Sequence, residues 1–94
     1  MNIDINKLEE ILTAILEELK ARGIASVPLD ADFYWNIPSE AIYDTYNEPS
    51  ELDIGQLEDD YEMLLSAKNK GKLVGYNLKH ASSLLRYIAE KHPA

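Results

Sequence analysis

The feature that most constrains the fold is a stretch of helical periodicity near the N-terminus. Apolar side chains recur there at alternating steps of three and four residues, at Ile5, Leu8, Leu12, Ile15 and Leu19. This spacing places them in one stripe along an α-helix, with glutamates on the other side. Asp4 before the stripe and Gly23 after it are typical capping residues. We therefore predict a helix over about residues 4–22.

Two later segments also have helical character. The first is predicted over about residues 53–69, because Asp53 and Gln56 have the spacing of a capping box. The second is predicted over about residues 73–92, with Pro93 beyond its end. Both carry an apolar stripe of the helical period, so each is expected to bury one face.

Residues 24–50, between the first two helices, form an aromatic-rich arm. Apolar and polar side chains alternate through its first half, which is the period of an extended segment with one buried face. Phe33 and Trp35 fall on the predicted buried face, and Tyr34 falls on the opposite face. No second segment with this period is evident, so we expect the arm to cross the helices or to pair with a second copy in a homodimer.

These elements predict a mainly α fold, in which three helices and an extended arm form one domain over residues 1–94. The helix stripes and the arm are expected to share one core. Its predicted members are Leu12, Ile15, Trp35, Leu64, Leu78 and Leu85.

The charge of the chain is unevenly distributed. The net charge is −8, but residues 1–62 carry −13 and residues 63–94 carry +5. Either the basic end folds back on the acidic part, or the two parts present separate patches to partners. Nucleic-acid binding is disfavoured, because affinity for phosphates requires a basic surface.

Several classes of site and location are not predicted. The chain has no cysteine, which excludes disulfides and cysteine-bound zinc. The N-terminus lacks the pattern of a signal peptide, and no stretch approaches the about 18 apolar residues of a membrane span. We therefore expect a soluble cytoplasmic protein with no membrane association and no cofactor.

No catalytic or metal-binding constellation is predicted either. His80 and His92 are too far apart on one helix to share a metal. Ser83 lies three residues after His80 and could touch it, but no nucleophile elbow surrounds the serine. The acidic run over residues 58–62 lacks the spacing of a calcium loop, which favours a solvated helix face.

The candidate partner-binding surface combines exposed acids with an aromatic side chain, a composition found at interfaces. Its predicted members are Asp30, Asp32, Tyr34, Asp59, Asp60 and Glu62. Lys70 and Lys72 precede the third helix and form a weaker candidate anion site, although the same lysines would also favourably end the second helix.

The arm and the start of the second helix resemble small uncharacterised bacterial proteins. The resemblance rests on residues 33–38, on Tyr43, Tyr46 and Pro49, and on residues 52–59, which include a Gly-Gln-Leu helix start. It spans most of the chain and implies no activity.

Two functional hypotheses remain. The first is a non-enzymatic, acidic protein-interaction module, such as an inhibitor, an immunity-type protein or an adaptor, which covers a basic protein partner. It rests on the acidity of residues 1–62 and on the tyrosine-rich arm. The alternative is a small ligand-binding or enzymatic subunit with a site formed across a homodimer.

Overall fold

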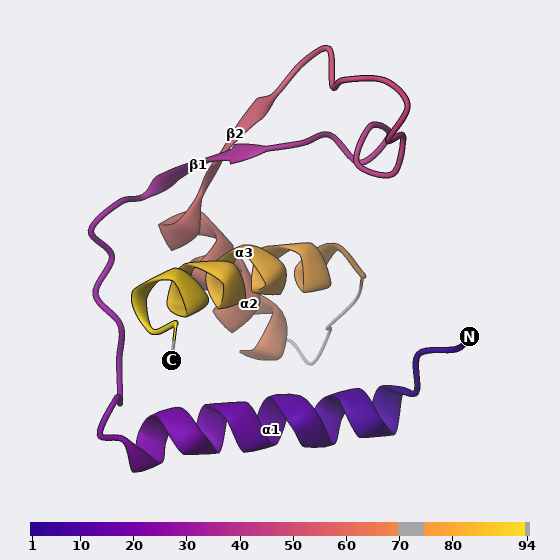
Figure 1. Cartoon of the computed structure of the whole chain (residues 1–94). Coiled ribbons are helices and arrows are strands. Elements are labelled where there is room, and N and C mark those ends of the chain that lie inside the picture. Colours follow the sequence, from indigo (N-terminus) through magenta and orange to yellow (C-terminus); the bar gives the residue numbers. More distant parts are fainter. Residues whose placement is uncertain (70–74, 94) are drawn as a thin grey trace.

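The computed structural model describes residues 1–69 and 75–93, which form three α-helices and one small antiparallel sheet (Figure 1). The elements follow in the order α1 (Ile5–Ala21), β1 (Phe33–Asn36), β2 (Asp53–Gln56), α2 (Leu57–Asn69) and α3 (Gly75–Lys91). The mainly α class predicted from the sequence is confirmed. The predicted start of the last helix, at residue 73, lies outside the described residues.

Local capping signals set both ends of α1. The Asp4 carboxylate accepts a hydrogen bond of 3.1 Å from the backbone amide of Lys7, as an N-cap residue does. At the other end Gly23 adopts a φ of 84°, a left-handed conformation that costs glycine little. The Ile24 amide then donates to the Leu19 carbonyl oxygen at 3.0 Å, which is the long hydrogen bond of a Schellman motif.

The expectation that the arm has no strand partner in its own chain was wrong. Residues 53–56, predicted as the start of the second helix, form β2 and pair antiparallel with β1. In this register Tyr34 lies opposite Gly55, and Trp35 lies opposite Ile54. A four-residue strand is too short to show a clear period of two, and β2 runs directly into α2, so the helical pattern masked it.

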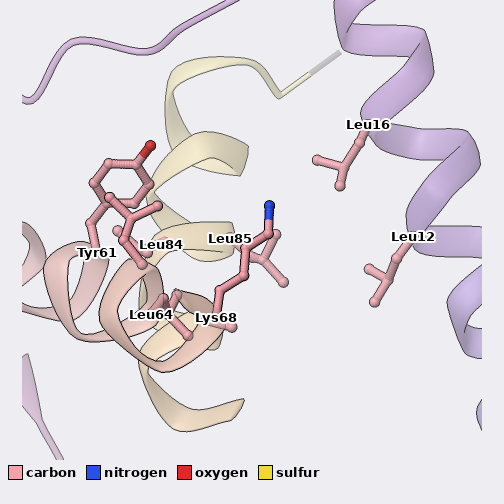
Figure 2. A pocket seen from close by; sticks show the side chains of 9 residues that line it. Leu12, Leu16, Tyr61, Leu64, Lys68, Leu84 and Leu85 are labelled. Carbon is pink, nitrogen blue, oxygen red and sulfur yellow. The ribbon is translucent and has the colours of Figure 1, made fainter. Parts of the chain in front are cut away.

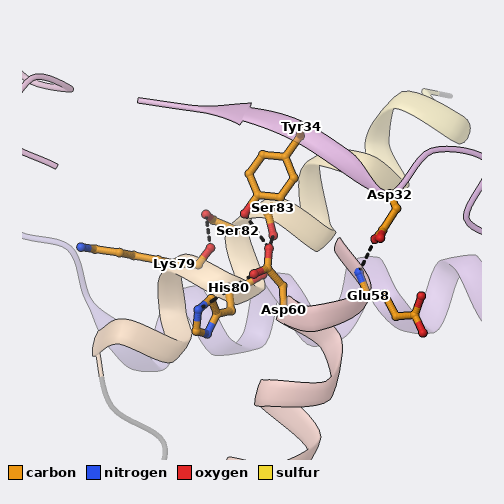
Figure 3. Close-up of polar contacts among 8 residues, drawn as sticks. All are labelled: Asp32, Tyr34, Glu58, Asp60, Lys79, His80, Ser82 and Ser83. Carbon is orange, nitrogen blue, oxygen red and sulfur yellow. Dashed lines mark hydrogen bonds and ion pairs between the residues drawn. The ribbon is translucent and has the colours of Figure 1, made fainter. Parts of the chain in front are cut away.

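The period of two at β1 is present, but the predicted faces are reversed. Phe33 and Trp35 are 65% and 71% exposed, whereas Tyr34 is half-buried. The Tyr34 ring lies directly over Gly55, and a Cβ atom at that glycine would overlap the ring. Only glycine at position 55 leaves space for the ring. The Tyr34 hydroxyl then points toward the helices (Figure 3).

The single core predicted from the helix stripes is also wrong. Its six proposed members are half-buried or exposed in the structure, namely Leu12, Ile15, Trp35, Leu64, Leu78 and Leu85. α2 and α3 pack against each other and the sheet adjoins the start of α2, while α1 lies apart along one side (Figure 1). Among the described residues Leu57, at the junction of β2 and α2, is the only buried apolar side chain.

The chain is correspondingly open. Its radius of gyration is 15.0 Å, against about 12 Å for a compact domain of this length. Its accessible surface is 8177 Å² for a mass of 10.7 kDa, whereas a compact monomer of that mass exposes about 5,500 Å². Apolar helix faces supply much of this additional surface, most clearly on α1, which has no buried residue.

Candidate functional site

The first candidate site is a polar cluster around Asp60, where β1, α2 and α3 meet (Figure 3). Asp60 is only 7% exposed, and its Oδ2 atom accepts hydrogen bonds from the Tyr34 hydroxyl at 2.6 Å and the Ser83 hydroxyl at 2.5 Å. The Nε2 atom of His80 lies 4.0 Å from the other carboxylate oxygen. The cluster therefore joins three elements through one carboxylate.

The local sequence explains why these groups converge. Asp60 lies in the first turn of α2, where the helix dipole favours a negative charge. His80 and Ser83 are three residues apart on α3 and so lie on the same face of that helix. Tyr34 reaches the cluster because Gly55 leaves space for its ring. Burial, with the hydrogen bond to Asp60, raises the pKa of Tyr34 above its ordinary value.

The cluster contains serine, histidine and aspartate, but its geometry differs from that of an activated nucleophile. The hydroxyl of Ser83 contacts Asp60 and the backbone carbonyl oxygen of His80, the latter at 2.8 Å, rather than the imidazole ring. A general base must reach the proton that it removes. The imidazole Nδ1 atom is buried without a hydrogen-bond partner among the described residues, and the ring packs edge-on against Tyr76. The contacts favour a structural role for Asp60.

Asp60 is thus buried, whereas the sequence predicted that the acidic run over residues 58–62 would form a solvated helix face. Asp59 and Glu62 are exposed, as that face requires, and neither has a side-chain partner within the described part of the chain. Asp60 points between α2 and α3 instead, because residues one position apart on a helix differ by about 100° in direction. Only part of the predicted acidic patch on α2 therefore faces solvent.

Asp32, a second predicted surface residue, caps α2 from a distance in sequence. Its Oδ1 atom accepts a hydrogen bond of 2.9 Å from the Glu58 amide, and its carbonyl oxygen accepts one of 2.8 Å from the Leu57 amide. These contacts satisfy amides that the first turn of a helix leaves unpaired. The sequence had indicated Asp53 for this role, which instead lies in β2.

Asp30 and the end of α3 form a third contact between the arm and the helices. Lys91 donates to the Asp30 carboxylate, and this hydrogen bond raises the pKa of Lys91 above its ordinary value. The Asp30 amide donates to the Tyr87 hydroxyl at 2.8 Å, and that hydroxyl donates to the Pro28 carbonyl oxygen at 3.2 Å. At this point the basic end of the chain does fold back on the acidic part.

The predicted partner-binding residues thus separate into two groups. Asp30, Asp32, Tyr34 and Asp60 make contacts within the chain, while Asp59 and Glu62 face solvent. Lys70 and Lys72, the predicted anion site, lie outside the described residues. The described residues contain no group of three or more His, Asp or Glu side chains arranged to hold a metal. None of the described helices has the length and apolar character needed to cross a membrane.

The second candidate site is an apolar groove between α1 and the α2–α3 pair (Figure 2). It encloses about 380 Å³ and is lined by Leu12, Leu16, Tyr61, Leu64, Leu65, Lys68, Ala81, Leu84 and Leu85. The side chains of Leu12 and Leu16 point from α1 toward leucines of the other two helices, with a gap between them (Figure 2). The core predicted from the sequence included three of these residues, Leu12, Leu64 and Leu85, because an apolar stripe does not reveal whether neighbouring elements close over it.

Comparison with protein-family models, with curated proteins and with solved structures returned no match.

Proposed function

We propose that the chain is a protein-interaction module that binds its partner through the amphipathic helix α1. The observation that supports this proposal is the exposure of the α1 apolar stripe. Ile5, Ile11 and Ile15 are 71%, 56% and 53% exposed, although they occupy one side of a regular helix. A contiguous apolar surface of this kind marks a site of association in soluble proteins. An amphipathic helix commonly supplies such a site by entering a groove on its partner.

The charges around this stripe indicate the chemistry of the partner. Glu9, Glu10, Glu17 and Glu18 outnumber Lys7 and Lys20 on the rest of α1, which gives the helix a net charge of −2. A partner with an apolar groove and a basic border would match both properties of the helix. Asp59 and Glu62 are exposed on α2 and add to the negative field. Salt screens such attraction over about 8–10 Å, so we expect association to slow at high ionic strength.

Site-specific photocrosslinking in the native cell tests this function. A photoreactive residue at Ile11 should form a covalent adduct with a protein, because that position faces the proposed partner. The matched control is Ile42, an isoleucine of similar exposure, 49% against 56%, in the loop between β1 and β2. A protein adduct at Ile11 with none at Ile42 supports the proposal. No adduct at either position, or equal labelling at both, contradicts it.

A second candidate function, binding of a small apolar ligand, is favoured by the volume of the groove. Its volume of about 380 Å³ falls within the range of about 300–1,000 Å³ that is common for ligand pockets. Among the described residues of its lining, Lys68 is the one cation, which suits an apolar carboxylate. Native mass spectrometry of the purified chain distinguishes this function, because a bound ligand adds a discrete mass that organic solvent removes.

A further inference from the structure

We infer that the partner of the α1 surface is a second copy of this chain, in a symmetric dimer in which α1 of each copy lies against α3 of the other. The inference rests on the proposed function, because it names the occupant of the same surface. Four observations support it, namely the area left exposed, the width of the apolar stripe of α1, the exposed leucines of α3 and the charges of the two helices.

The additional exposed area is slightly larger than the area that each partner of an obligate dimer commonly buries. The chain exposes 8177 Å², about 2,700 Å² more than a compact monomer of its mass. Obligate homodimers bury about 2,000–5,000 Å² in total, or about 1,000–2,500 Å² on each partner. A large interface with one second copy could therefore cover most of the additional surface. A short peptide or a small molecule would cover too little of it.

The apolar stripe of α1 is too wide for the helices of its own chain to cover. Leu16 lines the intrachain groove, whereas Ile11 does not and is 56% exposed. Five residues apart on a helix, these side chains point about 140° away from each other. Closing α1 onto α2 and α3 of the same chain would bury the Leu16 edge and leave the Ile11 edge in water. A second copy can cover that remaining edge.

α3 offers a matching apolar surface. Leu78 and Leu85 are 73% and 40% exposed on that helix, and Leu85 also lines the groove beside α1. The groove therefore carries partly exposed leucines from both α1 and α3, namely Leu16 and Leu85. In a two-fold symmetric dimer each contact occurs twice, so α1 of one copy can meet α3 of the other in both halves of the interface.

The charges of the helices favour packing of α1 against α3 of the second copy over packing of α1 against α1. α1 (Ile5–Ala21) carries a net charge of −2, and α3 (Gly75–Lys91) carries +2 with histidine neutral. Packing α1 against α1 of the second copy would place like charges together, which is unfavourable. Packing α1 against α3 joins opposite charges around an apolar centre. Lys79 and Arg86 directly follow Leu78 and Leu85 in the sequence of α3; within the chain Lys79 donates to the Ser39 hydroxyl and Arg86 pairs with Glu90.

Sedimentation equilibrium of the full chain tests the dimer. We expect a species of twice 10.7 kDa at micromolar concentration. Ile15→Glu and Leu78→Glu should each weaken the dimer by about tenfold or more, because each places a charge in a desolvated interface. Ile42→Glu, a matched change at a loop isoleucine that is 49% exposed, should leave the dimer unchanged. A single 10.7 kDa species at every concentration up to about 100 µM would overturn the inference.

Cysteine cross-linking tests the arrangement and does not require that a charged variant remain folded. The chain contains no cysteine, so each introduced thiol is unique. A chain with Ile15→Cys is mixed with one carrying Leu78→Cys, and a short thiol-reactive cross-linker is added. We expect mainly mixed adducts between α1 and α3. A majority of adducts joining two Ile15→Cys chains would contradict the arrangement.

The two proposals can fail separately. A monomeric purified chain whose Ile11 position crosslinks to a different protein would refute the dimer and leave the interaction function standing. The absence of any protein adduct at Ile11 would contradict the interaction function itself. A monomer that carries a bound apolar molecule would refute the dimer and favour the ligand-binding alternative.

Discussion

The Tyr34 hydroxyl donates a hydrogen bond of 2.6 Å to the Asp60 carboxylate, 26 residues further along the chain. This contact joins β1 to α2, and Ser83 adds α3 by donating to the same oxygen atom. In the described part of the chain Leu57 is the only buried apolar side chain, so these hydrogen bonds have few buried apolar contacts beside them.

We expect Tyr34→Phe to lower the free energy of unfolding by about 1–3 kcal/mol. The variant keeps the ring over Gly55 but removes one of the two donors that solvate the buried Asp60 carboxylate. Urea denaturation followed by circular dichroism measures the change. Tyr46→Phe is the control, because Tyr46 is 97% exposed. Equal stabilities of the two variants would show that the Tyr34 hydrogen bond does not contribute.

The raised pKa of Tyr34 predicts a loss of stability at alkaline pH. Burial and the neighbouring Asp60 raise this pKa above the ordinary value of 10.0, so the folded chain keeps the phenol proton where the unfolded chain loses it. The protonated Tyr34 phenol stabilises the fold fully below its pKa in the unfolded chain. This stabilisation is lost as the pH rises through its pKa in the folded chain. The unfolding free energy of the parent should therefore fall more steeply than that of Tyr34→Phe above pH 10.0, as urea titrations at several pH values would show.

Neutralising the acids of α2 should have unequal effects. Asp60→Asn changes a buried carboxylate that accepts two hydrogen bonds, and we expect it to destabilise the fold by about 1–3 kcal/mol. Asp59→Asn, its neighbour, changes an exposed side chain and should alter stability by less than about 0.5 kcal/mol. Thermal denaturation of both variants at one protein concentration provides the comparison. A similar melting temperature for the two would indicate that Asp60 is solvated.

Removal of the remote cap should weaken the start of α2. Asp32→Ala deletes the carboxylate that accepts from the Glu58 amide, and loss of an N-cap costs about 0.5–2 kcal/mol. Asp53→Ala is the matched control, because the sequence indicated Asp53 as the cap and the structure places it in β2. Hydrogen exchange at the Glu58 amide should accelerate in the Asp32 variant and stay nearly unchanged in the control. Faster exchange in the Asp53 variant alone would indicate that Asp53, and not Asp32, caps α2.

A methyl group at Gly55 should disrupt the contact between the sheet and the helices. Gly55→Ala would place a Cβ atom where the Tyr34 ring lies, which forces the tyrosine to move. We expect a cost of about 1–3 kcal/mol from this overpacking. Gly75→Ala, where nothing lies within 4 Å of the new atom, should be neutral or stabilising in a helix. Chemical denaturation measures the free energy of unfolding of both variants, and equal values would contradict the predicted overlap at Gly55.

Elements whose signals are local could be predicted from the order of the residues. Both ends of α1 follow from Asp4 and Gly23, because a cap acts within about four residues of the amides and carbonyls that it satisfies. The amphipathic character of α1 and α3 is likewise readable from spacing alone. The acidity of residues 1–62 is a property of composition, and it motivates the interaction function without locating it.

Contacts between distant residues, in contrast, select which of these faces are covered. A period of two shows that β1 has two faces, but the space over Gly55 and the acceptor at Asp60 select the Tyr34 face for burial. The pairing of β2 with β1 and the capping of α2 by Asp32 both join segments that are far apart in the sequence. Such contacts depend on where the chain returns in space, and no local pattern encodes that position. For the same reason, the stripe of α1 predicted a buried face, whereas the structure leaves much of that face exposed.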